Sequence, residues 1–166
     1  MQGTKTTSRW LEPGQQQIWR MYLSGTTLLN ERLDRDLRAA HDLSLPEYEV
    51  LVRLSESPDR RLRMAELATS LYHSRSRITH TVTRMEREGL VRRSSCPTDR
   101  RGVIAEMTDA GYARLVESAP THVAGVREHL VDVAEPDDFA AVGRVFAAVA
   151  ATFADEADHG DEVSAG

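Results

Sequence analysis

The sequence has a single cysteine, Cys96, and a single lysine, Lys5, among its 166 residues. One cysteine excludes an intrachain disulfide and a multi-cysteine zinc site, and it suits a reducing compartment. The longest uncharged apolar run, 145–154, is bounded by Arg144 and Asp155 and is far shorter than the roughly 20 residues of a membrane span. The polar N-terminal segment lacks the apolar core of a signal peptide. We therefore expect a cytoplasmic protein without a transmembrane helix.

Catalytic and metal-binding motifs are also missing. Two pairs of histidines lie seven residues apart, His73 with His80 and His122 with His129, but no HExxH motif or acidic ligand set accompanies them. The sequence has no Gly-rich phosphate loop, no Gly-x-Ser-x-Gly elbow and no Ser-x-x-Lys pair. We therefore expect no enzymatic activity, no bound metal and no cofactor.

Charge is unevenly distributed along the chain, although the formal net charge is only −5. Residues 60–101 contain eleven arginines against four acidic residues, a local charge of +7. Residues 109–166 contain three arginines against twelve acidic residues, a local charge of −9. A basic segment beside an acidic one is typical of a local anion-binding surface. A solvated charged face, the alternative, would interleave the two signs.

The length and the hydrophobic fraction of 40% suit one substantial core, so we expect a single folding unit over residues 1–166. Apolar residues at near-helical spacing, with proline or serine at the helix starts, predict three N-terminal helices. They are expected over residues 12–41, 44–57 and 64–71.

A fourth helix is expected between Ser74, which can cap its N-terminus, and Gly89, a residue type favoured just beyond a helix C-terminus. Its inward face, continued past the glycine, comprises Ile78, Val82, Met85 and Leu90. Its opposite face is polar and basic and carries Ser76, His80, Thr83, Arg84 and Arg87. Two short helices joined by a tight turn, the second with such a face, indicate a helix-turn-helix.

The segments 91–95 and 103–107 are extended in pattern and flank a proline-containing turn, which predicts a β-hairpin, or wing. In the second segment, Val103, Ala105 and Met107 alternate with polar or exposed positions. Two helices follow, beginning near Thr108 and Pro136. The last one has apolar residues spaced 3, 4, 3 and 4 apart, a seam suited to a partner helix: Phe139, Val142, Phe146, Val149 and Phe153.

We therefore predict a mainly α protein with a small β-hairpin wing. Residues 44–108 are expected to form a winged helix-turn-helix DNA-binding module. Residues 12–42 and 109–155 are expected to form a helical dimerisation region, and residues 156–166 a flexible acidic tail.

Four short motifs lie in order between the fourth helix and the fifth: Ser74-Arg75-Ser76-Arg77-Ile78-Thr79, Glu88-Gly89-Leu90-Val91-Arg92-Arg93, Asp99-Arg100-Arg101-Gly102 and Met107-Thr108-Asp109-Ala110-Gly111. In order and spacing they resemble the MarR (multiple antibiotic resistance regulator) family of transcription factors. The resemblance implies an intertwined, triangular homodimer built from the first, fifth and sixth helices. It further implies a regulator, commonly a repressor, that small phenolic or other amphipathic ligands release from DNA.

The resemblance also implies how DNA is read. The fourth helix would enter the major groove, and Arg101, held by Asp99, would enter the adjacent minor groove, where narrow width attracts arginine. The candidate DNA-binding residues are Ser74, Arg75, Ser76, Arg77, Thr79, His80, Thr83, Arg84, Arg93, Asp99 and Arg101. Guanidinium groups bind phosphate and guanine in bidentate fashion. The alternative is a solvated helix face with Arg84 paired to Glu88, and wing residues that only stabilise a turn.

A ligand pocket is implied between the first, second and fifth helices, with Trp19, Arg20 and Tyr48 as candidate lining residues. The alternative is that these aromatic residues belong to the core. Cys96 could sense oxidants if Arg92 and Arg93 lowered its pKa, but an incidental thiol is the simpler interpretation, because the first helix lacks the cysteine of the family's oxidant sensors.

The prediction for function is therefore a homodimeric regulator that binds a pseudo-palindromic operator in double-stranded DNA and responds to a small aromatic or phenolic effector. The alternative is a protein-interaction module that keeps the winged helix fold without binding DNA. A small enzyme would require a nucleophile and a base that the sequence does not offer.

Overall fold

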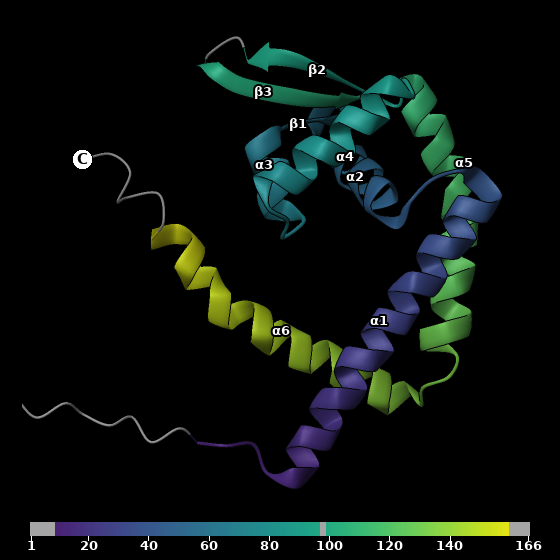
Figure 1. The fold of residues 1–166 in the computed structure, drawn as a ribbon, viewed down its shortest axis with the longest axis vertical. Helices are drawn as coiled ribbons and strands as arrows, with labels where there is room; N and C mark the ends of the chain where they lie inside the picture. Colours follow the sequence, from purple (N-terminus) through teal and green to yellow (C-terminus); the bar gives the residue numbers. More distant parts are fainter. Residues whose placement is uncertain (1–8, 97–98, 160–166) are drawn as a thin grey trace, which may run out of the picture. The chain divides into compact units, whose positions relative to one another are not determined.

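The computed structural model describes residues 9–96 and 99–159, without the side chains of residues 100, 101 and 154–159 (Figure 1). The chain divides into two compact units, Met1–Gly125 and Val126–Gly166, which are described separately. The first unit contains α1 (Pro13–His41), α2 (Leu45–Ser55), a 3-10 turn η1 (Pro58–Arg60), β1 (Arg61–Arg63), α3 (Met64–Ser70), α4 (Arg75–Arg87), β2 (Val91–Cys96), β3 (Asp99–Met107) and most of α5 (Asp109–Val126).

The helix boundaries follow from local capping. At the start of α2, the Glu47 backbone donates to the Ser44 hydroxyl, and the Ser44 backbone donates to the Glu47 carboxylate at 2.8 Å, which completes a capping box. At the start of α4, the Ser74 hydroxyl accepts from the Arg77 backbone at 3.2 Å. Gly89, with a φ of 73°, lies just beyond the end of α4. The predicted helix starts are therefore confirmed.

A three-stranded antiparallel sheet, in the order β1-β3-β2, packs beside the helices. The hairpin of β2 and β3 is the predicted wing, and it carries an irregularity in register between Ser95 and Cys96. The third strand, β1, was not predicted from the sequence. It pairs through Arg61 with Glu106 and through Arg63 with Ile104, so it closes the wing against the start of α3.

The core of the first unit lies where the end of α1 meets α2, α3, α4 and the sheet. The predicted inward residues of α4 and its continuation, Ile78, Val82, Met85 and Leu90, are all buried. On β3, Ala105 and Met107 are buried as the alternation predicts, but Val103 is 41% exposed because the hairpin extends past the helices there (Figure 1). Burying this core fixes α4 by one face and leaves its other face outward.

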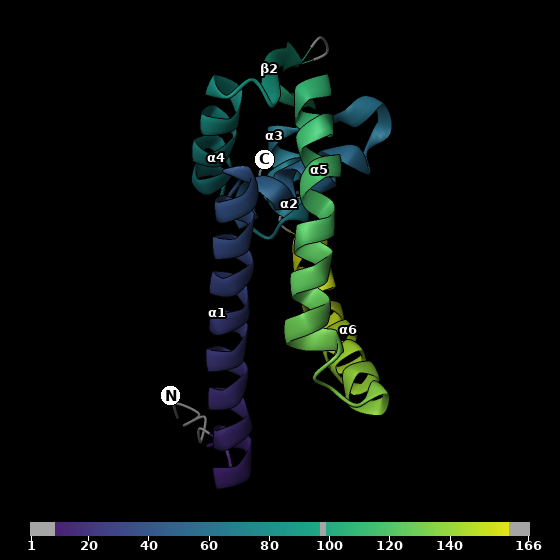
Figure 2. The same cartoon turned by 90° about the vertical axis from the view of Figure 1, so that its right-hand side faces the viewer.

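The N-terminal half of α1 extends away from this core (Figure 2). Large apolar side chains are exposed along it, namely Ile18, Trp19, Met21, Tyr22, Leu23 and Leu28. The C-terminal end of α1 contacts α5, because the Arg114 guanidinium donates to the His41 carbonyl at 2.7 Å and the His41 ring lies 2.8 Å from the Thr121 hydroxyl. On α5, Val116 and Val123 are also exposed. So much exposed apolar surface is unusual for a monomer in water.

The second unit contains a π-helical turn, η2 (Arg127–Val131), and α6 (Pro136–His159). The five seam residues of α6, from Phe139 to Phe153, are between 37% and 59% exposed. The helix continues to His159, so it is longer than predicted, because Glu and Ala at 156 and 157 favour helix. The remainder of the expected tail, 160–166, lies outside the described residues.

Candidate nucleic-acid interface

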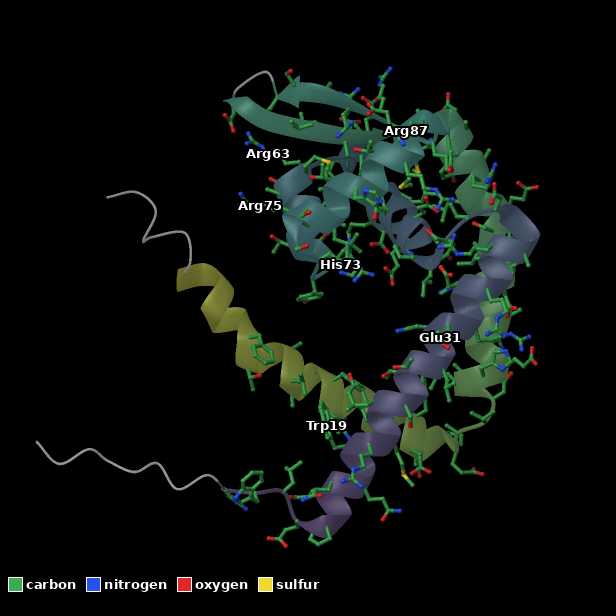
Figure 3. The ribbon with its side chains drawn as sticks, in the orientation of Figure 1. Trp19, Glu31, Arg63, His73, Arg75 and Arg87 are labelled. Carbon is green, nitrogen blue, oxygen red and sulfur yellow. The ribbon has the colours of Figure 1, made fainter. Side chains whose placement is uncertain are left out.

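The outward face of α4 is polar and basic, as predicted. Arg75, Ser76, Arg77, Thr79 and His80 are all exposed, as is the N-cap Ser74. The Thr79 and Thr83 hydroxyls donate to the Arg75 and Thr79 carbonyls at 2.8 and 2.7 Å, so these short side chains lie close to the helix. Figure 3 shows Arg75 near the first turn of α4 and Arg87 near its last.

Three arginines of α4 differ from the other basic residues of the module. Among the side chains that the structure describes, Arg75, Arg77 and Arg87 have no carboxylate within 4.0 Å. All three are exposed. Because no carboxylate competes for them, their guanidinium groups present positive charge and hydrogen-bond donors to an incoming anion.

Arg84, by contrast, is held by two carboxylates. Its Nε atom lies 3.1 Å from Oε1 of Glu88, one turn along α4, and 3.1 Å from Oε1 of Glu47 on α2. Glu47 is only 1% exposed and also accepts from the Ser44 backbone. The hydrogen bond to Glu88 and the charge of Glu47 both raise the pKa of Arg84 above its ordinary value. Arg84 therefore joins the recognition helix to the capped start of α2.

Arg93 is likewise paired, with the last turn of α4. Its Nη2 atom lies 2.6 Å from Oε2 of Glu86, and its backbone donates to the same carboxylate at 3.0 Å. These two hydrogen bonds lower the pKa of Glu86. On the same hairpin, Arg92 and Arg61 both bind Glu106, whose pKa is lowered chiefly by the hydrogen bond from Arg92. Arg93 thus fixes the wing to α4.

Asp99 begins β3, and its Oδ2 atom accepts from Nη1 of Arg63 at 3.2 Å. The side chain of Arg101, which the sequence analysis expects Asp99 to hold, lies outside the described residues. Arg63 was not predicted as a site residue. It is 36 positions away from Asp99 in the sequence, so no local spacing signals the contact.

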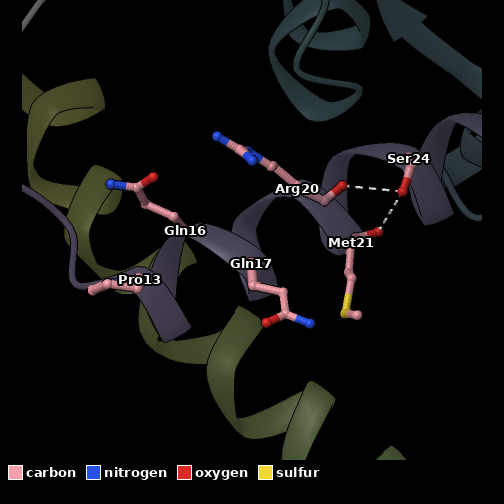
Figure 4. A pocket seen from close by; sticks show the side chains of 6 residues that line it. All are labelled: Pro13, Gln16, Gln17, Arg20, Met21 and Ser24. Carbon is pink, nitrogen blue, oxygen red and sulfur yellow. Dashed lines mark hydrogen bonds between the residues drawn. The ribbon is translucent and has the colours of Figure 1, made fainter.

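The three candidate ligand-binding residues have separate surroundings. Trp19 is 51% exposed and stacks on Tyr22 at 5.5 Å between ring centroids. Tyr48 is 7% exposed and packs against His122 at 4.4 Å, and burial raises the pKa of its phenol. Arg20 lines an open depression of about 640 Å³ that contains neither aromatic residue (Figure 4). The lining of that depression belongs to α1 alone and comprises Pro13, Gln16, Gln17, Arg20, Met21 and Ser24.

Other site types find little support in the part of the chain that the structure describes. There, no group of three or more His, Cys, Asp or Glu side chains is arranged to hold a metal ion. No helix within the described ranges is long and apolar enough to cross a membrane. Cys96 is buried at the base of the wing, which does not favour the exposed thiolate of an oxidant sensor.

Comparison with known proteins supports this description of the site. A family model described as the MarR family matches residues 43–103. The chain is 41% identical to Sco3205, a MarR family transcriptional regulator from Streptomyces coelicolor, over 90% of this chain and 94% of that one. The two structures compare with a TM-score of 0.85, and the Sco3205 crystal structure is a complex with DNA.

Two further relatives agree. AbsC, another MarR family regulator of Streptomyces coelicolor, is 40% identical, with a TM-score of 0.81 and coverage of 88% of this chain and 98% of that one. The transcriptional regulator MhqR of Bacillus subtilis is 27% identical over 66% of this chain and 73% of its own. These similarities confirm the predicted winged helix-turn-helix fold. They also confirm the prediction of a regulator, because the relatives are transcription regulators rather than enzymes.

Proposed function

This chain belongs to the MarR family of transcriptional regulators, and we propose that it binds double-stranded DNA as a homodimer to control transcription. The observation that carries the proposal is the outward face of α4. There, Arg75, Arg77 and Arg87 are exposed without carboxylate partners among the described residues, while the opposite face is fixed in the core. A basic helix face held rigidly by packing is suited to the major groove of DNA.

In this proposal α4 supplies the base contacts and the wing supplies a minor-groove contact. Ser74, Ser76, Thr79, His80 and Thr83 are short or amphipathic, so they allow the helix to approach base edges closely. Arg75 and Arg77, in the first turn, bind phosphate or guanine. The wing places Arg101 at the minor groove, with Asp99 as its positioning residue. The crystal structure of Sco3205 with DNA supports such a role for the shared fold.

Arg84 and Arg93 have a different role from the one expected from sequence. Each is committed to a carboxylate, Arg84 to Glu47 and Arg93 to Glu86, at 3.1 and 2.6 Å. We assign both as positioning residues, which set the angle of α4 against α2 and of the wing against α4. A displaced recognition helix loses contacts it no longer reaches, so these pairs act on affinity indirectly.

The exposed apolar faces support the homodimer. They lie on the N-terminal half of α1, on α5 and on the α6 seam, and burial in a second copy would remove them from water. We assign residues 44–108 to DNA binding, and residues 12–42 and 109–155 to dimerisation. A two-fold symmetric dimer reads a pseudo-palindrome whose half-sites are about 10 base pairs apart, centre to centre.

Regulation by a small aromatic or phenolic ligand is the remaining part of the proposal, with the protein acting as a cytoplasmic repressor. Tyr48 and His122 form an aromatic contact between α2 and α5, at the junction of the DNA-binding and dimerisation regions. A ligand that inserts there would bias the spacing of the two recognition helices, with coupling of about 1–3 kcal/mol. A screen of phenols and aromatic carboxylates for shifts in melting temperature and DNA affinity tests this part.

The experiment for the main proposal is selection of genomic fragments by the purified protein, followed by footprinting. We expect a small set of fragments that share a pseudo-palindrome protected on one face of the duplex. A folded dimer that selects no fragment and binds no duplex would contradict the proposal. That result would favour the protein-interaction alternative.

A further inference from the structure

A groove lies between β1, the first turn of α4 and the base of the wing. Its volume is about 320 Å³, roughly ten times the ~30 Å³ that one water molecule occupies in the liquid. Its lining comprises Arg63, Met64, Ala65, Arg75, Thr79, Asp99, Gly102 and Val103. The groove therefore separates the two elements proposed to read the major and minor grooves.

Two arginines make the groove positive on balance. Figure 3 shows Arg63 and Arg75 projecting toward the same side of the module from different elements. The only carboxylate in the lining is Asp99, whose Oδ2 atom lies 3.2 Å from Nη1 of Arg63. A guanidinium has five N–H donors, more than one carboxylate oxygen can accept. Asp99 therefore orients Arg63 while the lining as a whole keeps a net positive charge.

The groove is also shaped for close approach. Thr79 lies one helical turn beyond Arg75, so both side chains face the same space. Gly102 contributes no side chain, and a Cβ atom there would come within 2.9 Å of the Cβ of Cys96 and 3.0 Å of Oδ2 of Asp99. Ala65 adds only a methyl group. A rigid, charged ligand can therefore come close to the backbone of β3.

We propose that this groove binds one backbone phosphate of DNA, at the point where the strand passes from the major groove to the minor groove. Arg63 and Arg75 bind the phosphate oxygens, the Thr79 side chain lines the same site, and Asp99 is a positioning residue for Arg63. The inference rests on the proposed function and adds to it a phosphate contact from β1, outside both the recognition helix and the wing. Such contacts set the register of a protein on the duplex rather than its sequence preference.

The first test compares salt dependence. Duplex affinity is measured at several salt concentrations for the wild-type dimer, for Arg63→Ala and for Arg92→Ala, on the selected operator and on a shuffled duplex. Arg92 is the matched control, because it is an exposed wing arginine paired with Glu106 and it does not line the groove. We expect Arg63→Ala to weaken both duplexes by the same factor and to lower the logarithmic salt slope by about 0.9 per site. Arg63→Lys should restore most of the slope.

The second test locates the phosphate. Uncharged methylphosphonates replace single phosphates along the operator, and each substituted duplex is titrated with wild-type protein and with Arg63→Ala. We expect one position per half-site at which the substitution weakens wild-type binding but no longer weakens binding by the variant. Melting temperature and dimer mass of each variant confirm that the fold is retained.

The outcomes separate the inference from the function on which it rests. Failure of the wild-type protein to bind any duplex overturns the proposed function. If the wild type binds and Arg63→Ala matches Arg92→Ala in slope and affinity, the phosphate site is wrong and the proposed function stands. Equal sensitivity of wild type and variant to every methylphosphonate likewise overturns the site.

Discussion

The Nε atom of Arg84, on the recognition helix, lies 3.1 Å from Oε1 of Glu47, a carboxylate buried at the start of α2. The same carboxylate accepts from the Ser44 backbone, so one side chain caps α2 and anchors α4. A buried carboxylate with a hydrogen-bonded cation is strongly destabilised when the cation is removed. The pair therefore connects the stability of the module to the placement of its recognition helix.

Arg84→Ala should lower the free energy of unfolding by about 1–3 kcal/mol, because it leaves the Glu47 carboxylate buried without its cation. Glu47→Gln should cost less in the Arg84→Ala background than in the wild type, because the two residues act together. Urea unfolding of the four proteins measures this coupling. DNA affinity should fall without a change in salt slope. Unchanged stability with a slope lower by about one unit would instead mean that Arg84 contacts phosphate.

Val149→Asp should dissociate the dimer, because it places a charge in the apolar seam of α6. Each buried valine contributes about 1.5–3 kcal/mol, and the substitution occurs in both copies. Ala151→Asp is the matched control, since residue 151 lies on the opposite face of the same helix at 100° per residue. Light scattering over a range of concentrations gives the result. Equal effects of both variants would place the interface elsewhere.

The wing offers a separate test of Asp99 and Arg101. If Arg101 enters the minor groove and Asp99 positions it, Arg101→Ala should weaken operator binding by about 1–3 kcal/mol. Asp99→Ala should weaken binding too, although removal of a negative charge near phosphates would by itself strengthen it. A double-mutant cycle on operator and shuffled duplexes decides between these. Additive losses, or tighter binding by Asp99→Ala, would contradict the positioning of Arg101.

His122 should make stability depend on pH. Burial against Tyr48 lowers its pKa, and its Nδ1 atom has no hydrogen-bond partner among the described residues. The folded state therefore favours neutral His122, and its contribution to stability is present above the ordinary pKa of 6.5 and is lost as pH falls below it. Urea unfolding at pH 7.5 and about pH 5.5 should show a smaller loss for His122→Phe than for the wild type. Identical losses would exclude His122 as the cause.

Much of the fold follows from local signals. Ser44, Ser74 and Gly89 mark helix ends through short-range capping, and the spacing of Ile78, Val82 and Met85 identifies the buried face of α4. Because one face of a helix determines the other, the candidate DNA-binding face could be predicted without the structure.

Features that depend on contacts distant in sequence could not be predicted. β1 is three residues long and contains two arginines, so only its pairing with β3 makes it a strand. The contacts of Arg63 with Asp99 and of Arg84 with Glu47 join elements 36 and 37 residues apart, and neither has a spacing signal. These contacts are what separate positioning arginines from those that remain available to DNA.

The most direct test of the account is the affinity of the purified dimer for its selected operator and for a shuffled duplex, measured by fluorescence anisotropy at several salt concentrations. The account predicts a steep salt slope on both duplexes, and an operator affinity at least about a thousandfold higher at physiological salt. Arg77→Ala should reduce that preference or that slope, since Arg77 is exposed on α4 without a carboxylate partner among the described residues. Equal, salt-insensitive affinity for the two duplexes, or no binding to either, would contradict it.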